Sequence, residues 1–257
     1  MDRKQIIKEF ISNGIVVIPD YATQDFCHSL IKEMNEIKEK YPNKIISQKS
    51  ENTAGDFRFF KLENLSKNVN LFKNDSFIKD IINQYCVTKF SSLFVLGGIV
   101  KFLGDKTTNS GGGWHRDSDE IQLKAMLYLT DVESSNGPFL FIKNSNNYDL
   151  RRRNKTDKEP WTAKLIRLIK KKKHQLTPRY EDYIIENEIK NDQIYEIKGK
   201  SGTLVLFDSS YIHRGKNIAE GQRYIIINYF FKKGVISKFF RKRQFRKYFL
   251  PINNSVD

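Results

Sequence analysis

The chain has 257 residues, a formal net charge of +15 at pH 7 and 39% hydrophobic residues. This length suits a single domain that buries a substantial core. No charge-free apolar run approaches about eighteen residues, which excludes a membrane-spanning helix, and the charged first residues do not fit a secretory signal. We therefore expect a cytoplasmic protein in which the two cysteines, Cys27 and Cys86, are free thiols.

Most of the positive charge lies in two segments. Residues 151–173 hold eleven lysines and arginines against two acids, and residues 232–247 hold eight and no acid. Their net charges of +9 and +8 exceed the total of +15, so the rest of the chain carries about −2. A nearly neutral body with two basic segments indicates a partner of negative charge.

Hydrophobic spacing predicts the order of helices and strands. A helix over residues 4–12 ends at Gly14, and a strand over residues 15–18 follows it. Thr23 can cap a second helix that runs to about residue 40, because apolar side chains recur there every three to four positions. Further predictions are a loop over 41–56, a strand over 57–62, a helix over 74–85, a strand over 93–103 and a glycine-rich loop over 104–113. The later strands are predicted over 121–129, 139–142, 202–208 and 224–231.

Residues 111–117 (GGGWHRD) combine a glycine turn with two side chains that can bind a metal ion. In an extended strand, side chains at i and i+2 share a face, so His115 and Asp117 can point at one ion. A second histidine, His213, follows the predicted buried strand over residues 202–208. Two histidines and one carboxylate form the set that holds Fe(II) on one face and leaves the opposite positions open.

Arg223 begins the last apolar run of the sequence. A planar guanidinium can grip a carboxylate with two parallel hydrogen bonds, so Arg223 could anchor a dicarboxylate cosubstrate. The His-X-Asp pair alone occurs often by chance. The ordered combination of that pair, a late histidine and an arginine has few competing explanations.

Several motifs carry a family resemblance: 10–18 (FISNGIVVI), 114–117 (WHRD), 129–131 (LTD), 136–138 (NGP), 202–207 (GTLVLF) and 213–217 (HRGKN) before Arg223. The sequence resembles the phytanoyl-CoA dioxygenase family of Fe(II)/2-oxoglutarate-dependent oxygenases over about residues 5–30 and 95–232. The resemblance implies a mainly β fold with flanking helices, built on a double-stranded β-helix (jelly-roll, cupin-like) core. It also implies that His115, Asp117 and His213 hold iron and that Arg223 pairs with the distal carboxylate of 2-oxoglutarate.

Three further basic residues are candidates for the site. Lys124 aligns near a position where relatives place a polar contact to 2-oxoglutarate. Lys101 could meet an anionic cosubstrate or substrate if it faces the barrel interior, and it is otherwise a surface lysine. Arg58 falls in a region that often lies near the site entrance, where it is either a substrate contact or a solvated charge on an edge strand. We also expect Asp208 and Asn217 to orient His213 or its loop.

We predict one catalytic domain over residues 1–232, interrupted by a basic insertion at about 148–193 and followed by a basic amphipathic tail over 233–257. Trp161, Leu165, Leu168 and Ile169 form an apolar stripe at helical spacing within the insertion. This helix either packs on the barrel with a solvated basic face or lies on an anionic membrane surface. The tail repeats the same mixture of phenylalanine and basic residues, and no nucleic-acid-binding signature accompanies either segment.

The sequence therefore predicts an Fe(II)- and 2-oxoglutarate-dependent dioxygenase that uses O2 to hydroxylate an unactivated C–H bond. The two basic segments indicate a small or membrane-associated substrate, such as an anionic glycan or a lipid-linked molecule, and peripheral association with the membrane. Two alternatives remain open, a zinc-type hydrolase on the same ligands and a non-catalytic barrel that binds membranes or nucleic acid. A zinc hydrolase has no need of Arg223, and a non-catalytic barrel has no need of the three ligands.

Overall fold

The computed structural model describes residues 2–48, 55–85, 89–104, 112–118, 121–146, 179–232 and 249–251. The predicted helix around Trp161, Cys86 and most of the C-terminal tail lie outside these residues. Within the described part of the chain, no helix is both long and apolar enough to span a bilayer.

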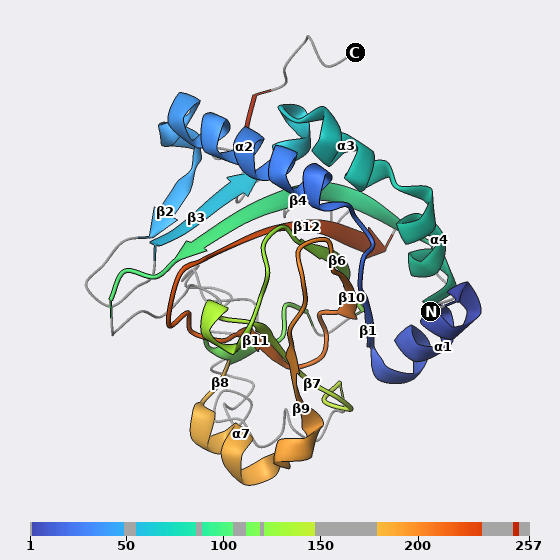
Figure 1. Ribbon diagram of the computed structural model, residues 1–257. Helices are drawn as coiled ribbons and strands as arrows, with labels where there is room; N and C mark the ends of the chain where they lie inside the picture. Colours follow the sequence, from blue (N-terminus) through green and yellow to red (C-terminus); the bar gives the residue numbers. More distant parts are fainter. Residues whose placement is uncertain are drawn as a thin grey trace, which may run out of the picture.

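Two antiparallel sheets form the body of the molecule (Figure 1). The larger sheet contains, in order, β1 (Ile15–Ile18), β10 (Leu204–Asp208), β6 (Leu123–Tyr128), β12 (Gln222–Lys232), β4 (Phe90–Lys101), β3 (Gly55–Phe60) and β2 (Ile46–Gln48). The smaller sheet contains β8 (Arg179–Tyr180), β5 (Trp114–His115), β11 (His213–Gly215), β7 (Phe139–Ile142) and β9 (Ile194–Ile197). This arrangement confirms the predicted jelly roll.

The two sheets bury one apolar core between them. Alternate residues of the larger sheet, Met126, Tyr128, Val205 and Phe207, pack against Phe139, Phe141 and Ile197 of the smaller sheet. The intervening residues of β6, such as Ala125 and Leu127, pack on the other face. In each strand of the larger sheet, every second side chain therefore lies on the inner face, which faces the smaller sheet.

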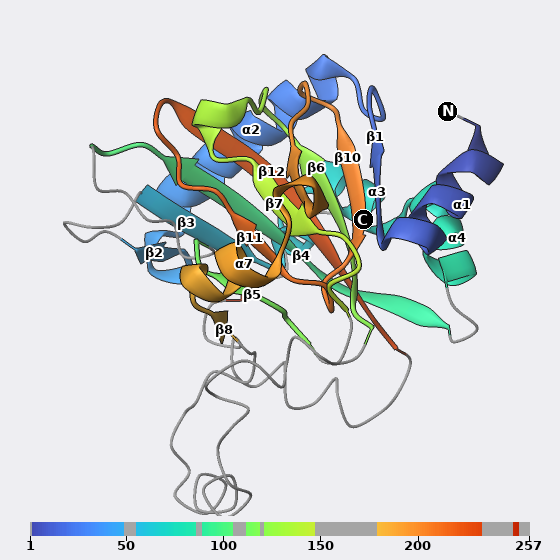
Figure 2. The same cartoon turned by 90° about the horizontal axis from the view of Figure 1, so that it is seen from below.

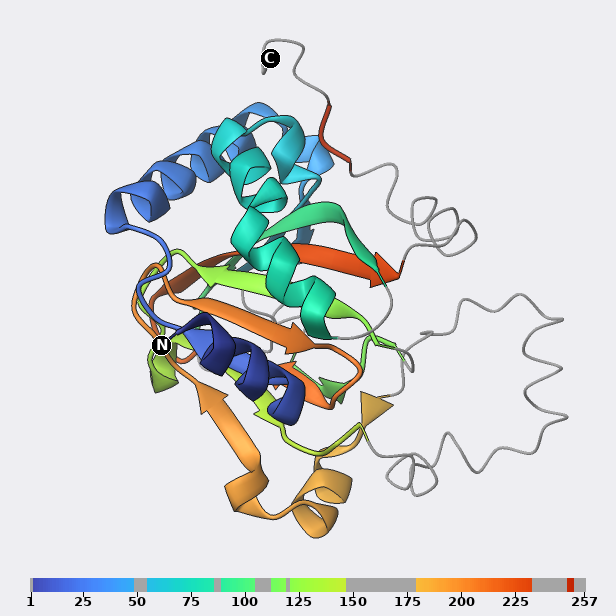
Figure 3. The same cartoon turned by 90° about the vertical axis from the view of Figure 1, so that its right-hand side faces the viewer.

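Helices cover the outer faces of both sheets, and Figure 3 shows the N-terminal helices on the side of the larger sheet opposite α7. The α-helices are α1 (Arg3–Asn13), α2 (Gln24–Lys40), α3 (Lys67–Asn74), α4 (Ser76–Tyr85) and α7 (Asp182–Glu188). Short 3-10 turns occur at η1 (Pro42–Lys44), η2 (Leu62–Asn64), η3 (Ser134–Asn136) and η5 (Asn191–Gln193). Leu30 and Met34 of α2 are fully buried against the larger sheet.

Local sequence signals set the helix ends where they were expected. The Thr23 hydroxyl accepts a hydrogen bond from the Phe26 amide at 3.2 Å and caps α2. Gly14 ends α1 in the left-handed region at φ 70°, and its amide donates to the Phe10 carbonyl at 2.9 Å. The predicted end of α1 at Gly14 and the predicted start of α2 after Thr23 are both confirmed.

Other boundaries differ from the prediction. Residues 41–56 contain η1, β2 and the start of β3 instead of a continuous loop, and α3 had no predicted counterpart. The end of the predicted insertion carries β8 and α7, so at least this part belongs to the domain. These elements are short and are stabilised by packing on the sheets, which local periodicity does not report.

Residues 249–251 lie against the body of the molecule. The Leu250 amide donates to the Phe60 carbonyl at 3.1 Å, and the Asn64 side chain donates to the Leu250 carbonyl at 2.7 Å. The Leu250 side chain is buried in the core between the larger sheet and its helices. This described part of the predicted tail is thus anchored beside β3.

This anchor predicts a stability effect for a residue far from any motif. Leu250→Ala removes a buried side chain and should lower the free energy of unfolding by about 2–5 kcal/mol. Leu71→Ala is the matched control, because Leu71 is 61% exposed and its loss should change stability by less than about 0.5 kcal/mol. Urea unfolding of both variants checks this, and equal midpoints would show that Leu250 does not contribute to the core.

Candidate metal centre

Three side chains converge between the two sheets. β11 pairs with β5 so that His213 lies directly opposite His115, and Asp117 follows β5. The Nε2 atoms of His115 and His213 each lie 3.7 Å from a different oxygen of Asp117. The candidate ligand atoms all lie within 4.8 Å of one another. An ion about 2 Å from each donor fits this spacing after a small inward movement.

Backbone carbonyls orient both imidazoles. The Nδ1 atom of His115 lies 2.7 Å from the Gly113 carbonyl oxygen, and that of His213 lies 2.8 Å from the Tyr211 carbonyl oxygen. Because a carbonyl only accepts, each Nδ1 carries a proton and each Nε2 presents its lone pair toward Asp117. Burial lowers the pKa of His115, and burial lowers the pKa of His213 to about 3. Both rings are therefore neutral, as metal ligands must be.

A buried lysine neutralises the carboxylate. Lys124 of β6 faces the interior and donates a hydrogen bond to Asp117. Burial by itself would raise the pKa of Asp117, but the charge and hydrogen bond of Lys124 outweigh it and lower that pKa. Asp117 is thus ionised. The structure places Lys124 at the carboxylate of the candidate centre. The contact to 2-oxoglutarate that the family resemblance implies for Lys124 stays a prediction.

One turn positions both ligand-bearing segments. β5 ends at His115, so strand pairing does not hold Asp117, whose amide instead donates to the Ser209 carbonyl at 2.9 Å. Two residues after Ser209, the Tyr211 carbonyl accepts a hydrogen bond from the ring of His213. The turn over residues 208–211 therefore sets the distance between the two ligand segments.

Asp208 holds this turn in shape. One of its carboxylate oxygens accepts from the Ser210 amide at 2.9 Å and from the Gln122 amide at 3.3 Å. The other accepts from the Tyr85 hydroxyl at 3.2 Å. Burial raises the pKa of Asp208, and these hydrogen bonds oppose that shift. The expected positioning role fits Asp208, whereas Asn217 is exposed and makes no comparable contact among the described residues.

Arg223 lies on the inner face of the larger sheet. It pairs in register with Val100 of β4, which pairs with Asp56 of β3. Arg223 is 7% exposed, and its buried Nε atom has no hydrogen-bond partner among the described residues. Burial lowers the pKa of Arg223, against the influence of Tyr128 and Asp56. A buried guanidinium with an unsatisfied N–H is suited to receive an anion.

The structure does not bring Lys101 to the centre. Lys101 is exposed at the end of β4 and shares the face of Ile99, which packs against the helices. Side chains alternate along a strand, so Lys101 lies on the face opposite Val100 and Arg223. Arg58 lies on the inner face instead, since it pairs with Gly98, which pairs with Ile225.

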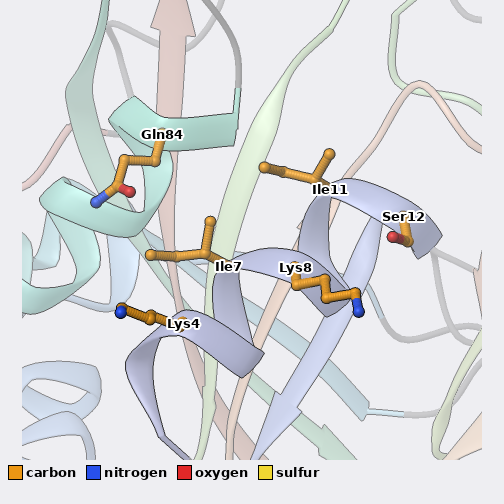
Figure 4. A pocket seen from close by; sticks show the side chains of 6 residues that line it. All are labelled: Lys4, Ile7, Lys8, Ile11, Ser12 and Gln84. Atoms are coloured by element: carbon orange, nitrogen blue, oxygen red, sulfur yellow. The ribbon is translucent and has the colours of Figure 1, made fainter.

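An open groove on the outside of the molecule is separate from the centre. It lies between α1 and α4 (Figure 4) and is lined by Lys4, Ile7, Lys8, Ile11, Ser12 and Gln84. None of these residues contributes to the converging ligands or to the inner face that carries Arg223. We assign the groove no part in the site.

Comparison with known families agrees with this geometry. A family model described as phytanoyl-CoA dioxygenase (PhyH) matches residues 10–223. The chain belongs to the phytanoyl-CoA dioxygenase family. It is therefore an enzyme that depends on non-heme iron and 2-oxoglutarate and uses O2.

Solved structures share the fold of this phytanoyl-CoA dioxygenase family member at low identity. The epimerase SnoN from nogalamycin biosynthesis is 11% identical, with a TM-score of 0.61 over 90% of this chain and 82% of SnoN. The carbocyclase SnoK from the same biosynthesis is 12% identical, with a TM-score of 0.62 over 97% and 92%. HygX from Streptomyces hygroscopicus, with nickel, 2-oxoglutarate and hygromycin B bound, is 13% identical, with a TM-score of 0.56 over 90% and 87%. No curated protein sequence matched the chain.

Sequence reasoning missed the residues that act through backbone atoms. Ser209 and Tyr211 hold the ligand segments by their carbonyl groups, which any residue type supplies. Gly14 was expected only as a helix end, yet a Cβ there would lie 2.5 Å from the Tyr211 ring. Glycine thus lets the end of α1 approach the turn that carries His213.

This close approach predicts a coupled loss of stability and metal binding. Gly14→Ala should push the Tyr211 ring and, through its carbonyl, His213, lowering Fe(II) affinity about tenfold. Gly221→Ala is a matched control. Gly221 has a similar positive φ, +67° against +70° at Gly14, but a Cβ added at Gly221 would have no neighbouring atom closer than 3.5 Å. Both variants bear the backbone strain of about 1–2 kcal/mol, and only Gly14→Ala adds a steric cost of about 1–3 kcal/mol. Thermal unfolding and Fe(II) titration of both variants check this, and equal Fe(II) affinities would contradict the coupling.

Proposed function

We propose that His115, Asp117 and His213 hold Fe(II) and that Arg223 binds the distal carboxylate of 2-oxoglutarate. The observation that carries this is the convergence of three oriented donor atoms beside an inner face on which a buried guanidinium keeps an unpartnered Nε. The donor set is the one that non-heme Fe(II) oxygenases use. When bound, the iron and 2-oxoglutarate supply the oxidising chemistry that attacks an unactivated C–H bond.

The residues of the chain prepare the centre for both groups. The Gly113 and Tyr211 carbonyls keep the two Nε2 lone pairs aimed inward, and Lys124 holds the Asp117 carboxylate ionised. Without ligands, Lys124 and Arg223 exceed Asp117 by one positive charge. A ferrous ion and a doubly charged cosubstrate cancel each other, so loading both adds no net charge to the interior.

The apolar walls of the barrel keep water from the reaction. Met126, Ile225 and Ile227 of the larger sheet line the same inner face as Arg223 and Lys124. Phe139 and Phe207 pack against the ring of His213, with centroid distances of 5.4 and 5.7 Å. Such walls strengthen the electrostatic contacts of the centre and limit side reactions with water.

The proposed reaction is hydroxylation of an unactivated C–H bond in a small or membrane-associated substrate, such as an anionic glycan or a lipid-linked molecule. The basic composition of the chain supports an anionic substrate. Among proteins of this fold, HygX has been solved with hygromycin B and SnoN with nogalamycin RO. These complexes support a barrel that admits a bulky small molecule.

Anaerobic titration tests the iron and cosubstrate assignments together. Addition of Fe(II) and 2-oxoglutarate should produce the weak visible charge-transfer band of an iron-bound 2-oxo acid. Asp117→Ala and His213→Ala should abolish the band because they remove ligands. Arg223→Gln should keep Fe(II) binding but weaken 2-oxoglutarate about 10- to 100-fold, the size of one hydrogen bond from a charged donor.

A matched control separates the effect of the buried Arg223 from that of an exposed cation. Lys101→Gln removes the exposed lysine from the outward side of β4 and should leave 2-oxoglutarate affinity unchanged. Formation of succinate that requires both O2 and 2-oxoglutarate distinguishes the proposed enzyme from a zinc-type hydrolase. Equal 2-oxoglutarate affinity in Arg223→Gln and the wild type would overturn the assignment of Arg223.

Membrane association is the part of the proposal that rests on the basic tail. Basic residues near an anionic surface each contribute about 1 kcal/mol to binding. We expect the full chain to float with vesicles that contain phosphatidylglycerol and not with pure phosphatidylcholine vesicles. Replacement of Arg241, Lys242, Arg243, Arg246 and Lys247 by glutamine should reduce flotation, and it leaves the buried Leu250 in place, unlike a truncation.

The control for flotation removes charge from the opposite end of the chain. Lys4→Gln with Lys8→Gln neutralises two exposed lysines of α1, which Figure 4 shows at the rim of the outer groove. This variant should float as well as the wild type. Equal recovery of the wild type on neutral and anionic vesicles would rule out the membrane proposal.

A further inference from the structure

A buried arginine lies between two of the candidate ligands. Arg116 separates His115 from Asp117 in the chain and is 1% exposed. The Cζ atom of its guanidinium lies 5.9 Å from the ring centroid of Tyr180, which belongs to the apolar cluster on the outer face of the smaller sheet. In Figure 2, which views the molecule from the side of α7, this helix lies over that face. Arg116 therefore points away from the centre, and its buried charge needs polar partners.

Ser145 supplies one of these partners. Nη2 of Arg116 donates a hydrogen bond to the Ser145 carbonyl. Ser145 lies in the turn after β7 and is also 1% exposed. The residue before it, Asn144, has a φ of 58°, in the left-handed region that asparagine enters more readily than most side chains. The turn thus presents Ser145 to the segment that carries His115 and Asp117.

The same serine also holds the segment that carries the third candidate ligand. The Ser145 hydroxyl accepts from the Ile212 amide at 2.7 Å and donates to the Ile142 carbonyl at 2.6 Å. The Ile142 amide in turn donates to the Ile212 carbonyl at 3.0 Å. Ile212 directly precedes His213 in the chain. Ser145 therefore contacts both ligand-bearing segments, one through its carbonyl and the other through its hydroxyl.

The strand order explains how one residue reaches both segments. β11 lies between β5 and β7 in the smaller sheet. His213, the first residue of β11, pairs with His115 at the end of β5 and with Phe141 near the end of β7. The ends of β5 and β7 therefore flank the start of β11. Arg116 reaches past this start to the turn after β7, where the strand hydrogen bonds no longer act.

We propose that Arg116 and Ser145 are positioning residues for iron, which keep the three candidate ligands at the spacing that one ion requires. The inference rests on the proposed function, because it takes these three side chains as the iron ligands. The turn over residues 208–211 holds the ligand segments at one place, and the link through Ser145 holds them at a second. An apolar side chain would fill the position of Arg116 without the cost of burying a charge. The planar guanidinium instead supplies a directed hydrogen bond.

Anaerobic titration of the metal-free enzyme with Co(II) tests the proposal. Co(II) stands in for Fe(II), and its ligand-field absorption bands report the geometry of the bound ion. Arg116→Met removes the donor and keeps a long apolar chain, whereas Ser145→Ala removes the hydroxyl and keeps the carbonyl. Each variant should bind Co(II) about 10- to 100-fold more weakly and show altered bands at saturation. Arg116→Lys keeps a charged donor and should retain more affinity than Arg116→Met.

A second buried serine provides the matched control. Ser66 is 2% exposed, and its hydroxyl accepts from the Val69 amide at 3.0 Å where it caps α3 in the helix layer. Ser66→Ala should lower the thermal midpoint of the metal-free protein about as much as Ser145→Ala and bind Co(II) like the wild type. Because Arg116 and Ser145 form one link, their double variant should lose less affinity than the product of the two single losses.

The results that overturn the proposal differ from those that overturn the proposed function. If His213→Ala binds Co(II) as tightly as the wild type, the ion does not use the proposed ligands and the proposed function fails. If His213→Ala loses the ion but Arg116→Met or Ser145→Ala binds it like the wild type, the link does not position the ligands, while the proposed function stands. An equal loss of affinity in Ser66→Ala also overturns the link, since affinity then follows general stability. If Arg116→Met does not fold, Ser145→Ala decides the test.

Discussion

The candidate centre depends on one pair of backbone contacts from a single turn. β5 has two residues and β11 has three, so neither strand can fix its ligand by pairing alone. The Ser209 carbonyl holds the Asp117 amide, and the Tyr211 carbonyl holds the His213 ring. The same turn is tied to the N-terminal region, because the Asp208 amide donates to the Gly14 carbonyl at 2.8 Å. The helix layer thus supports the ligand geometry from outside the barrel.

The residues that the sequence could locate are those whose chemical type is restricted. Thr23 and Gly14 mark helix ends because few side chains can cap a helix or adopt its left-handed terminus. His115, Asp117 and His213 were found because few side chains bind a metal, and the structure brings them together. Arg223 was found because it opens an apolar strand, where a charged residue has to serve a purpose.

The residues that the sequence could not place depend on register between strands. β4 is covered by helices on one face and by the barrel core on the other, so its apolar run does not reveal which face each residue takes. Because neighbouring side chains of a strand point to opposite faces, Val100 points inward and Lys101 points outward. The contact of Lys124 with Asp117 could not be read from the sequence, because it follows from the position of the separate strand β5, while its contact with 2-oxoglutarate stays a prediction.

The residues of the candidate centre and those of β3 and β8 come from different parts of the sheets. The candidate ligands His115 and His213 and the proposed cosubstrate anchor Arg223 come from β5, β11 and β12, which have paired neighbours on both sides, and Asp117 directly follows β5. Arg58 and Arg179 come from β3 and β8, which extend the two sheets beyond β4 and β5. A barrel of this kind can keep one reaction while strands beyond its centre vary in sequence. Asp56 connects the two parts, since this buried carboxylate contacts Arg58 and also acts electrostatically on Arg223.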